Sequence, residues 1–166
     1  MPSFGRIASI VALSALSACT AEADTPVSGG LFQAILPGQW SQVSAKPDLY
    51  VYRRAADDAQ VTFSSLYSAH SMPVAQQRET LQLLTDKHRA AQLKAGPGIV
   101  LSVPVLSASR VSARFVGYDS GARLRAATLL LGGSNGVVIT YFEVIDTDEK
   151  SFESQAENIL ASVSLK

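Results

Sequence analysis

The feature that most constrains the fold is a pair of strand-like segments that almost touch in the sequence. The segments 124–131 and 137–145 are rich in apolar and β-branched residues, and only Gly-Gly-Ser-Asn-Gly (132–136) separates them. Asn-Gly is typical of the tight turn of a β-hairpin, because both residues tolerate the positive φ angles that such a turn requires. The pattern therefore predicts two neighbouring antiparallel strands, with Asn135 and Gly136 at the centre of the turn.

Alternation of apolar and polar residues predicts further strands on both sides of a long helical segment. Residues 31–36 are expected to form the first strand, with Phe32 and Ala34 on one face and Ile35 on the other. The segment 99–106 contains Pro104, which favours an edge strand or a bulge because proline cannot donate to a neighbouring strand. The remaining predicted strands are residues 49–53, 61–67 and 109–118.

Two segments have the three- and four-residue spacing of apolar residues that is typical of amphipathic helices. The first is predicted to begin at an N-cap Ser71, with Pro73 in its first turn, and to end at Gly96-Pro97-Gly98. The second is predicted to follow an N-cap at Asp146 or Thr147. The residues expected on the buried faces are Val74, Leu81, Leu84, His88, Ala91 and Ala95 in the first helix, and Phe152, Ala156, Ile159, Leu160 and Val163 in the second. Two helices separated along the chain from mostly antiparallel strands indicate an α+β fold.

The first nineteen residues have the organisation of a secretory signal that ends at a cysteine. Arg6 is the only charged residue before an apolar run over residues 7–16, which is too short to span a bilayer. Leu16-Ser17-Ala18-Cys19 resembles the lipobox of bacterial lipoproteins, in which the cysteine carries a diacylglycerol and the chain is cut before it. Two alternatives remain: cleavage after residues 21–23, which would release a soluble protein, and retention of the uncleaved run as a tether.

The lipobox predicts three regions: a signal peptide at 1–18, a lipidated Cys19 with a flexible tether at 19–30, and one domain at 31–166. The expected location is the bacterial envelope, anchored by lipid and facing the periplasm. Thr20 follows the cysteine where an Asp would resemble an inner-membrane retention signal, so the outer membrane is favoured.

Charge and cysteine content exclude several classes of function. The 14 Lys and Arg residues, less Arg6 of the signal peptide, leave 13 against 14 Asp and Glu. A chain without basic excess is not expected to bind nucleic acid. Because Cys19 is the only cysteine, lipidation would leave the domain without a disulfide, a reactive thiol or a thiolate metal ligand.

Several short motifs between residues 31 and 165 resemble the Mog1/PsbP-like superfamily, and within it the small DcrB-type bacterial lipoproteins. The motifs are Leu36-Pro37-Gly38-Gln39-Trp40, Phe115-Val116-Gly117, Tyr141-Phe142-Glu143 and Phe152 followed by Ile159-Leu160-Ala161-Ser162. The resemblance implies an α/β/α sandwich with a mostly antiparallel central sheet, and a non-enzymatic adaptor that binds a partner. The region of the second and third strands is shorter than in that superfamily. Nothing here matches the residues with which its nuclear or photosynthetic members bind their partners.

No combination of residues predicts catalysis, a metal site or a cofactor. His88 is expected to be a half-buried helix residue, His70 lies in a loop, and two separated histidines do not make a metal site. Acidic residues at 146–149 are explained by helix capping, since they lack the length and glycine of a calcium loop. The candidate partner-binding residues are Trp40, Tyr50, Tyr52, Arg53 and Arg54, provided that the tyrosines share an exposed face.

Three functional hypotheses follow from the sequence. The favoured one is a non-enzymatic envelope lipoprotein whose domain binds a protein partner, in an adaptor or envelope-maintenance role. The first alternative is an immunity lipoprotein that neutralises a toxin delivered to the periplasm. The second is a hydrolase that uses His88 with an acid, although the sequence contains no recognisable set of nucleophile, base and orienting group.

Overall fold

The computed structural model describes residues 23–107 and 109–166, so Cys19 and the predicted signal peptide lie outside the described residues. An eight-stranded sheet forms the centre, and every pairing in the described part of the chain is antiparallel. Its strand order is β3 (Ser41–Lys46), β4 (Leu49–Arg54), β5 (Ala59–Tyr67), β10 (Gly136–Ile145), β9 (Leu124–Gly133), β8 (Ser112–Asp119) and β6 (Ile99–Leu101), with β7 (Val105–Leu106) also paired to β8. A small second sheet contains β1 (Thr25–Gly29), β2 (Phe32–Leu36) and β11 (Ser164–Leu165).

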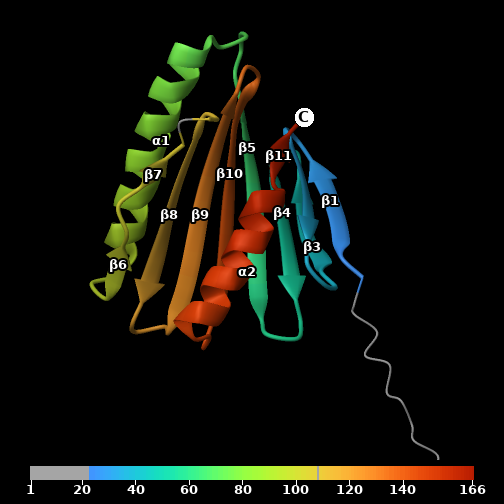
Figure 1. Cartoon of the computed structure of the whole chain (residues 1–166), viewed down its shortest axis with the longest axis vertical. Helices are drawn as coiled ribbons and strands as arrows, with labels where there is room; N and C mark the ends of the chain where they lie inside the picture. Colours follow the sequence, from blue (N-terminus) through green and yellow to red (C-terminus); the bar gives the residue numbers. More distant parts are fainter. Residues whose placement is uncertain (1–22, 108) are drawn as a thin grey trace, which may run out of the picture.

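The two helices cover opposite faces of the central sheet (Figure 1). Helix α1 (Val74–Ala95) packs on β6, β8, β9 and β10, while α2 (Glu149–Ser162) packs on β9, β10 and β2. Successive residues of β9 point to different cores: Leu130 packs with α1, whereas Leu129 and Leu131 pack on the side of α2. This alternation is the two-residue period of a strand that is buried on both sides. The predicted α+β fold with a mostly antiparallel sheet and helices on both faces is therefore confirmed.

The predicted hairpin joins β9 to β10 at the centre of the sheet. Gly133 pairs with Gly136, so the two residues in the loop are Ser134 and Asn135, one position earlier than expected. Gly136 has a φ of 146°, and a Cβ at this position would collide with the carbonyl oxygen of Leu66 on β5. The glycine is thus required by both the backbone conformation and the close approach of the neighbouring strand.

Aromatic side chains attach the small sheet to the central sheet. The ring of Phe32 on β2 is fully buried and stacks on that of Phe63 on β5, with centroids 4.1 Å apart. The ring of Tyr50 on β4 packs edge-on against the ring of Phe32, with centroids 5.4 Å apart. Burial of this cluster and of the apolar face of α2 forms the larger of the two cores.

The predicted tether at 19–30 is wrong for residues 25–29, which form β1. Thr25 to Gly29 pair with β2 along the whole strand, and the side chain of Val27 is buried. The ring of Tyr50 occupies the space that a Cβ on Gly29 would take, so this glycine belongs to a packed strand and not to a flexible linker.

The prediction also missed β3, which follows the Pro37-Gly38 turn directly. Five of its six residues are exposed and the sixth, Ser44, is polar, and the pairing with β4 shifts between Gln42 and Ser44, where Val43 bulges out. A polar, bulged edge strand lacks the apolar alternation on which strand prediction depends.

Both predicted helix caps are wrong. Pro73 occupies the N-cap position of α1 in an extended conformation, and no side chain of the described residues caps the helix. An N-cap at Ser71 would place Met72 in the helix, where the following proline disfavours the helical conformation. In α2 the cap is Asp148, whose carboxylate accepts the backbone N–H of Ser151 at 3.0 Å. Asp146 instead adopts a φ of 56° in the preceding turn.

The buried stripe of α1 differs in part from the predicted one. Leu81 is buried and Leu84 and His88 are half-buried, but Val74, Ala91 and Ala95 are exposed. Polar residues take the missing places: Gln77 donates to the carbonyl of Met72 at 2.8 Å, and the hydroxyl of Thr85 donates to that of Leu81 at 2.8 Å. Each polar group is buried with a hydrogen-bond partner, which removes most of the cost of burying it.

Candidate functional site

The predicted partner-binding residues do not form an exposed patch. Tyr50 and Tyr52 do share one face of β4, but that face packs on the core, and Tyr52 and Trp40 are only 6% and 7% exposed. Burial, with a smaller contribution from Tyr50, raises the pKa of the Tyr52 hydroxyl. Arg53 points to the opposite face of the sheet because successive strand residues alternate.

Arg54, the last of these residues, has a structural role. Its guanidinium lies 4.8 Å from the ring of Trp40 and binds the carboxylate of Asp57, with nitrogen–oxygen distances of 2.6 and 2.8 Å. It also donates to the side chain of Gln155 on α2 at 2.6 Å. The side chain is only 15% exposed. Arg54 therefore ties β4 to α2 and is not available to a partner.

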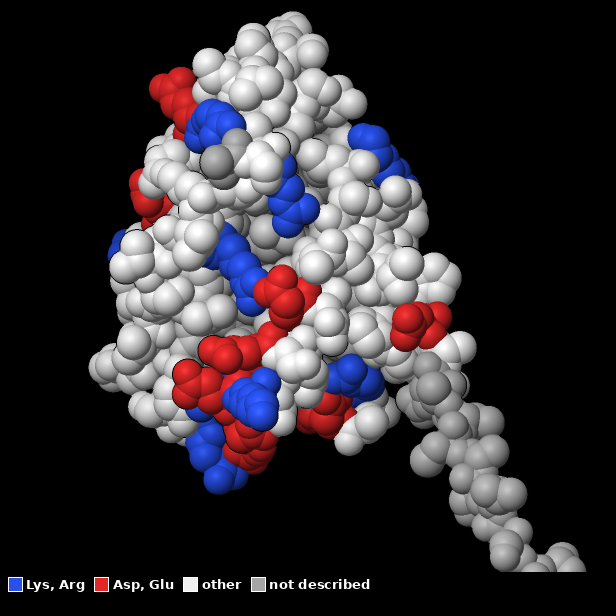
Figure 2. All heavy atoms as spheres, in the orientation of Figure 1, with Lys and Arg blue, Asp and Glu red and all other residues white. Residues whose placement is uncertain are grey.

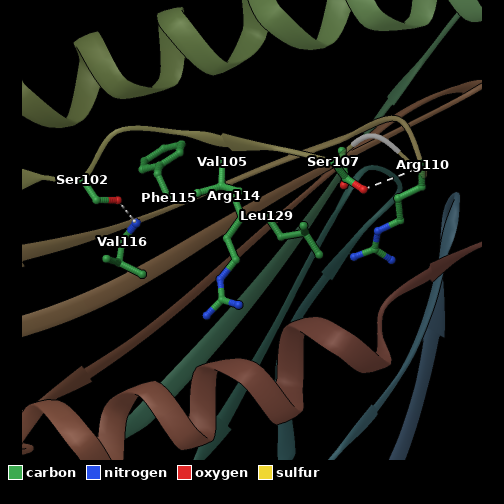
Figure 3. A pocket seen from close by; sticks show the side chains of 9 residues that line it. Ser102, Val105, Ser107, Arg110, Arg114, Phe115, Val116 and Leu129 are labelled. Carbon is green, nitrogen blue, oxygen red and sulfur yellow. Dashed lines mark hydrogen bonds between the residues drawn. The ribbon is translucent and has the colours of Figure 1, made fainter.

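An open groove of about 500 Å³ lies on the α2 side of the sheet, along β7 and β8. Figure 3 shows Arg114 of β8 and Arg110 of the loop between β7 and β8, both directed to the side of the sheet where α2 lies. The groove, called here the β7–β8 groove, is lined by Ser102, Val105, Ser107, Arg110, Ser112, Arg114, Phe115, Val116 and Leu129. Its lining thus combines two guanidinium groups, three hydroxyl groups and an apolar floor.

The groove exists because the last strand of the sheet is interrupted. Leu101 pairs with Gly117 and Val105 pairs with Arg114, so three residues on the edge face two residues of β8. Ser102 bridges the gap, since its N–H donates to the carbonyl of Val116 at 2.8 Å and its hydroxyl accepts the N–H of Val116 at 3.0 Å. The extra residue makes a bulge next to Pro104, as the sequence predicted for this segment.

The bulged edge leaves four aliphatic side chains in solvent. Val100, Val103, Val105 and Leu106, called here the apolar edge, are 69%, 80%, 71% and 55% exposed. Single exposed aliphatic residues are common, but four within seven residues, beside a groove, are typical of a surface that another molecule covers. Pro104 indicated an edge strand or a bulge in the sequence, but no pattern indicated that the valines of this edge are exposed.

The charges in the groove are arranged asymmetrically. Arg114 makes an ion pair with Glu157 on α2, whereas the structure shows no ion pair of Arg110 among the described residues. The space-filling view of this face shows basic side chains along a hollow, with an acidic side chain at one end (Figure 2). A guanidinium at the open end of a groove is suited to a carboxylate or another planar anion.

The remaining predicted chemical residues lie elsewhere. His88 is half-buried on α1, its Nε2 is 3.1 Å from the side-chain nitrogen of Gln92, and burial lowers its pKa. Across residues 23–107 and 109–166, no group of three or more His, Cys, Asp or Glu side chains could hold a metal ion. None of the helices in the described part of the chain is long and apolar enough to cross a membrane.

Comparison with solved structures identifies the fold. The solution structure of PsbP from Synechocystis sp. PCC 6803 superposes with a TM-score of 0.53 at 11% identity, covering 93% of this chain and 99% of that one. The chain has a PsbP-like fold. A protein of Bacteroides thetaiotaomicron VPI-5482 matches with a TM-score of 0.50 and 12% identity over 88% of this chain, which spans only 49% of that protein.

A third structure is LpqN of Mycobacterium tuberculosis, described as involved in cell envelope biogenesis. It matches with a TM-score of 0.49 and 16% identity, covering 87% of this chain and 91% of that one. No family model matches the sequence, and no curated protein matches it either. At these identities the PsbP-like likeness describes the arrangement of the backbone and carries no residue roles to this chain.

Proposed function

We propose that this chain is a lipid-anchored protein of the bacterial cell envelope whose domain binds a protein partner through the β7–β8 groove and the apolar edge. The observation that carries the proposal is the exposure of Val100, Val103, Val105 and Leu106 beside two groove-lining arginines. Arginine is enriched among the residues that contribute most to protein–protein interfaces, and the buried centre of such an interface is more apolar than its rim.

The magnitudes are compatible with a specific contact. Burying a fully exposed Val or Leu contributes about 1.5–3 kcal/mol, so the four partly exposed residues would supply roughly 4–8 kcal/mol before the cost of association. The guanidinium of Arg110 can pair with an acidic group of the partner. We therefore expect an extended partner segment in which apolar residues alternate with at least one acid.

The anchor would keep this surface close to a membrane. If Cys19 carries the lipid, only residues 20–24 separate it from β1, and five residues extend at most about 18 Å. The partner should then lie in or near the same membrane, which we propose to be the outer membrane because Thr20 follows the cysteine. The proposed role is adaptor or envelope maintenance and involves no catalysis.

Introducing negative charge at the apolar edge tests the binding proposal. The double variant Val103→Asp, Val105→Asp should fold normally, since both residues are exposed. After the membranes are solubilised, a partner that co-purifies with the unaltered protein should no longer co-purify with this variant. The matched control is Leu83→Asp, Leu93→Asp, at exposed positions on α1 (54% and 49%). Quantitative comparison of co-purified proteins decides the matter: equal retention by both variants would overturn the proposed surface.

A separate experiment tests the anchor. The Cys19→Ala variant should be released from membranes by carbonate washing, whereas the unaltered chain should stay in the pellet. Metabolic labelling with a fatty acid should mark only the unaltered chain. If the variant remains with the membranes after the wash, the proposed lipid anchor is wrong. The apolar edge would then still be tested separately by the double variant.

A further inference from the structure

A second hollow, of about 180 Å³, lies on the opposite face of the sheet from the β7–β8 groove. It opens between the last turns of α1 and strands β6, β8, β9 and β10, and is called here the α1 cleft. Small residues make the space, because Gly117 and Ala126 are paired neighbours on its floor. A Cβ on Gly117 would lie 2.6 Å from the methyl carbon of Leu101, so a larger residue here would displace the Leu101 side chain.

The lining of the α1 cleft is mostly apolar. Ile99, Leu101, Leu124 and Ala95 form its walls, and the polar groups that reach it come from Gln92, Asp119 and Tyr141. A mostly apolar hollow with a few polar groups directed into it is the general form of a small-molecule site.

Two acids lie at the polar side of the cleft: Asp119 belongs to its lining, and Glu143 lies beside the lining residue Ala126. Glu143 lies next to Ala126 in the register of the sheet and on the same face, because it is two residues from Tyr141. Its carboxylate accepts the side-chain N–H of Gln60 at 3.0 Å. Burial, the charge of Glu143 and its hydrogen bond with the phenol, and the charge of Asp119 all raise the pKa of the Tyr141 hydroxyl. Tyr141 and Asp119 both line the cleft.

Basic groups do not balance these acids inside the cleft. Among the described residues, no Lys or Arg lines it. His88 is close to Tyr141, with ring centroids 6.4 Å apart, but burial lowers its pKa and so keeps it neutral at pH 7. Arg53 acts on Glu143 from two strands away, and it is shared with Asp58 at 3.8 Å. The cleft therefore presents an apolar floor, an aromatic ring and a net negative charge.

We propose that the α1 cleft binds a small organic ammonium ion that has a short apolar body. The ammonium group would take the acidic side, against Asp119, Glu143 and the ring of Tyr141, because aromatic rings and carboxylates both attract cations. The apolar body would cover Gly117 and Ala126. An anion is disfavoured by the two acids, and a neutral ligand would desolvate a carboxylate without pairing it.

The volume limits the size of the ligand. A space of about 180 Å³ is equivalent to roughly six water molecules at about 30 Å³ each. A space of this volume suits an alkylammonium ion of about five to eight non-hydrogen atoms. For so small a ligand we expect a dissociation constant of about 1 mM.

The test compares three ligands of similar shape on the folded chain without its signal peptide, by ¹⁵N–¹H NMR titration. n-Butylammonium should shift the amides of Gly117, Gly121 and Ala126 and saturate. n-Butanol should bind about tenfold more weakly, and butyrate should not bind. If the alcohol binds as tightly as the ammonium ion, if butyrate binds there, or if the shifts map away from α1 and β8–β10, the proposal is wrong.

Two sets of variants, each with a control, distinguish binding in the cleft from nonspecific effects of a substitution. Glu143→Gln and Asp119→Asn should each weaken n-butylammonium about three- to tenfold and leave n-butanol unchanged, whereas Asp86→Asn on the exposed side of α1 should change neither. Ala95→Leu should fill the mouth of the cleft and abolish binding, whereas Ala90→Leu, also exposed on α1, should have no effect. Unchanged affinity in both acidic variants, or in Ala95→Leu, would overturn the assignment.

Discussion

Removal of β1 is the perturbation that best tests whether the domain begins before residue 31. A chain that starts at Leu31 loses the buried side chain of Val27, which contributes about 1.5 kcal/mol. It also loses both bonds of the Thr25 hydroxyl, which donates to the carbonyl of Gly38 at 2.7 Å and accepts the N–H of Trp40 at 3.1 Å. These contribute about 1 kcal/mol each. The expected loss is therefore roughly 3–5 kcal/mol, including the exposure of β2.

The loss is measurable because a domain of this size is stabilised by only about 5–15 kcal/mol. Trp40 is the only tryptophan, it is buried, and it contacts Thr25, so its fluorescence reports urea unfolding directly. Chains that start at Asp24 and at Cys19 should unfold at the same urea concentration, and the chain that starts at Leu31 well below it. Val27→Ser should show a smaller loss. Equal midpoints for the starts at 24 and 31 would mean that residues 25–29 are a linker, as the sequence suggested.

Three further predictions concern single side chains. Thr140 is fully buried and its hydroxyl has no hydrogen-bond partner among the described residues, so Thr140→Val should raise the free energy of unfolding by about 1 kcal/mol; a lower urea midpoint would show that the hydroxyl is bonded. Burial raises the pKa of Glu143, opposed by the Tyr141 hydroxyl and Arg53, so the folded state holds this proton more tightly than the unfolded state. The stability that this proton contributes is present below the pKa of the unfolded state and is lost as pH rises through the pKa of the folded state. The free energy of unfolding of Glu143→Gln should therefore be higher than that of the unaltered protein at pH 7 and equal to it at pH 4. Arg54→Ala should cost about 2 kcal/mol through its contacts with Trp40, Asp57 and Gln155, whereas Arg53→Ala should change the urea midpoint little; the reverse order would contradict the assigned roles.

The sequence predicted the elements whose signals are local and strong. The hairpin around Asn135, the alternation of β5 and β8, and the apolar stripe of α2 all follow from period and turn chemistry. Strand β1 was missed because Thr-Pro-Val-Ser-Gly has the composition of a linker and becomes a strand only through pairing with β2. Tertiary pairing overrides weak local preference in such segments.

The predicted site failed for a different physical reason. Alternation shows that Tyr50 and Tyr52 share a face, but it does not show what covers that face. Two rings cover that face. Phe32 of β2 contacts Tyr50, and Phe63 of the neighbouring strand β5 contacts Tyr52. The apolar edge shows the same limit: Pro104 indicated an edge strand or a bulge, but the sequence pattern does not show whether another element covers Val103.

The most direct test of the central claim is position-specific photocrosslinking in bacteria that express the full chain. A photoreactive residue in place of Val103 or Val105 should give the same adduct with one envelope protein, and Arg110→Glu should abolish it. The same residue at Leu83 or Leu93 on α1 should give no such adduct. Adducts of equal yield from all four positions, or none from the apolar edge, would contradict the account.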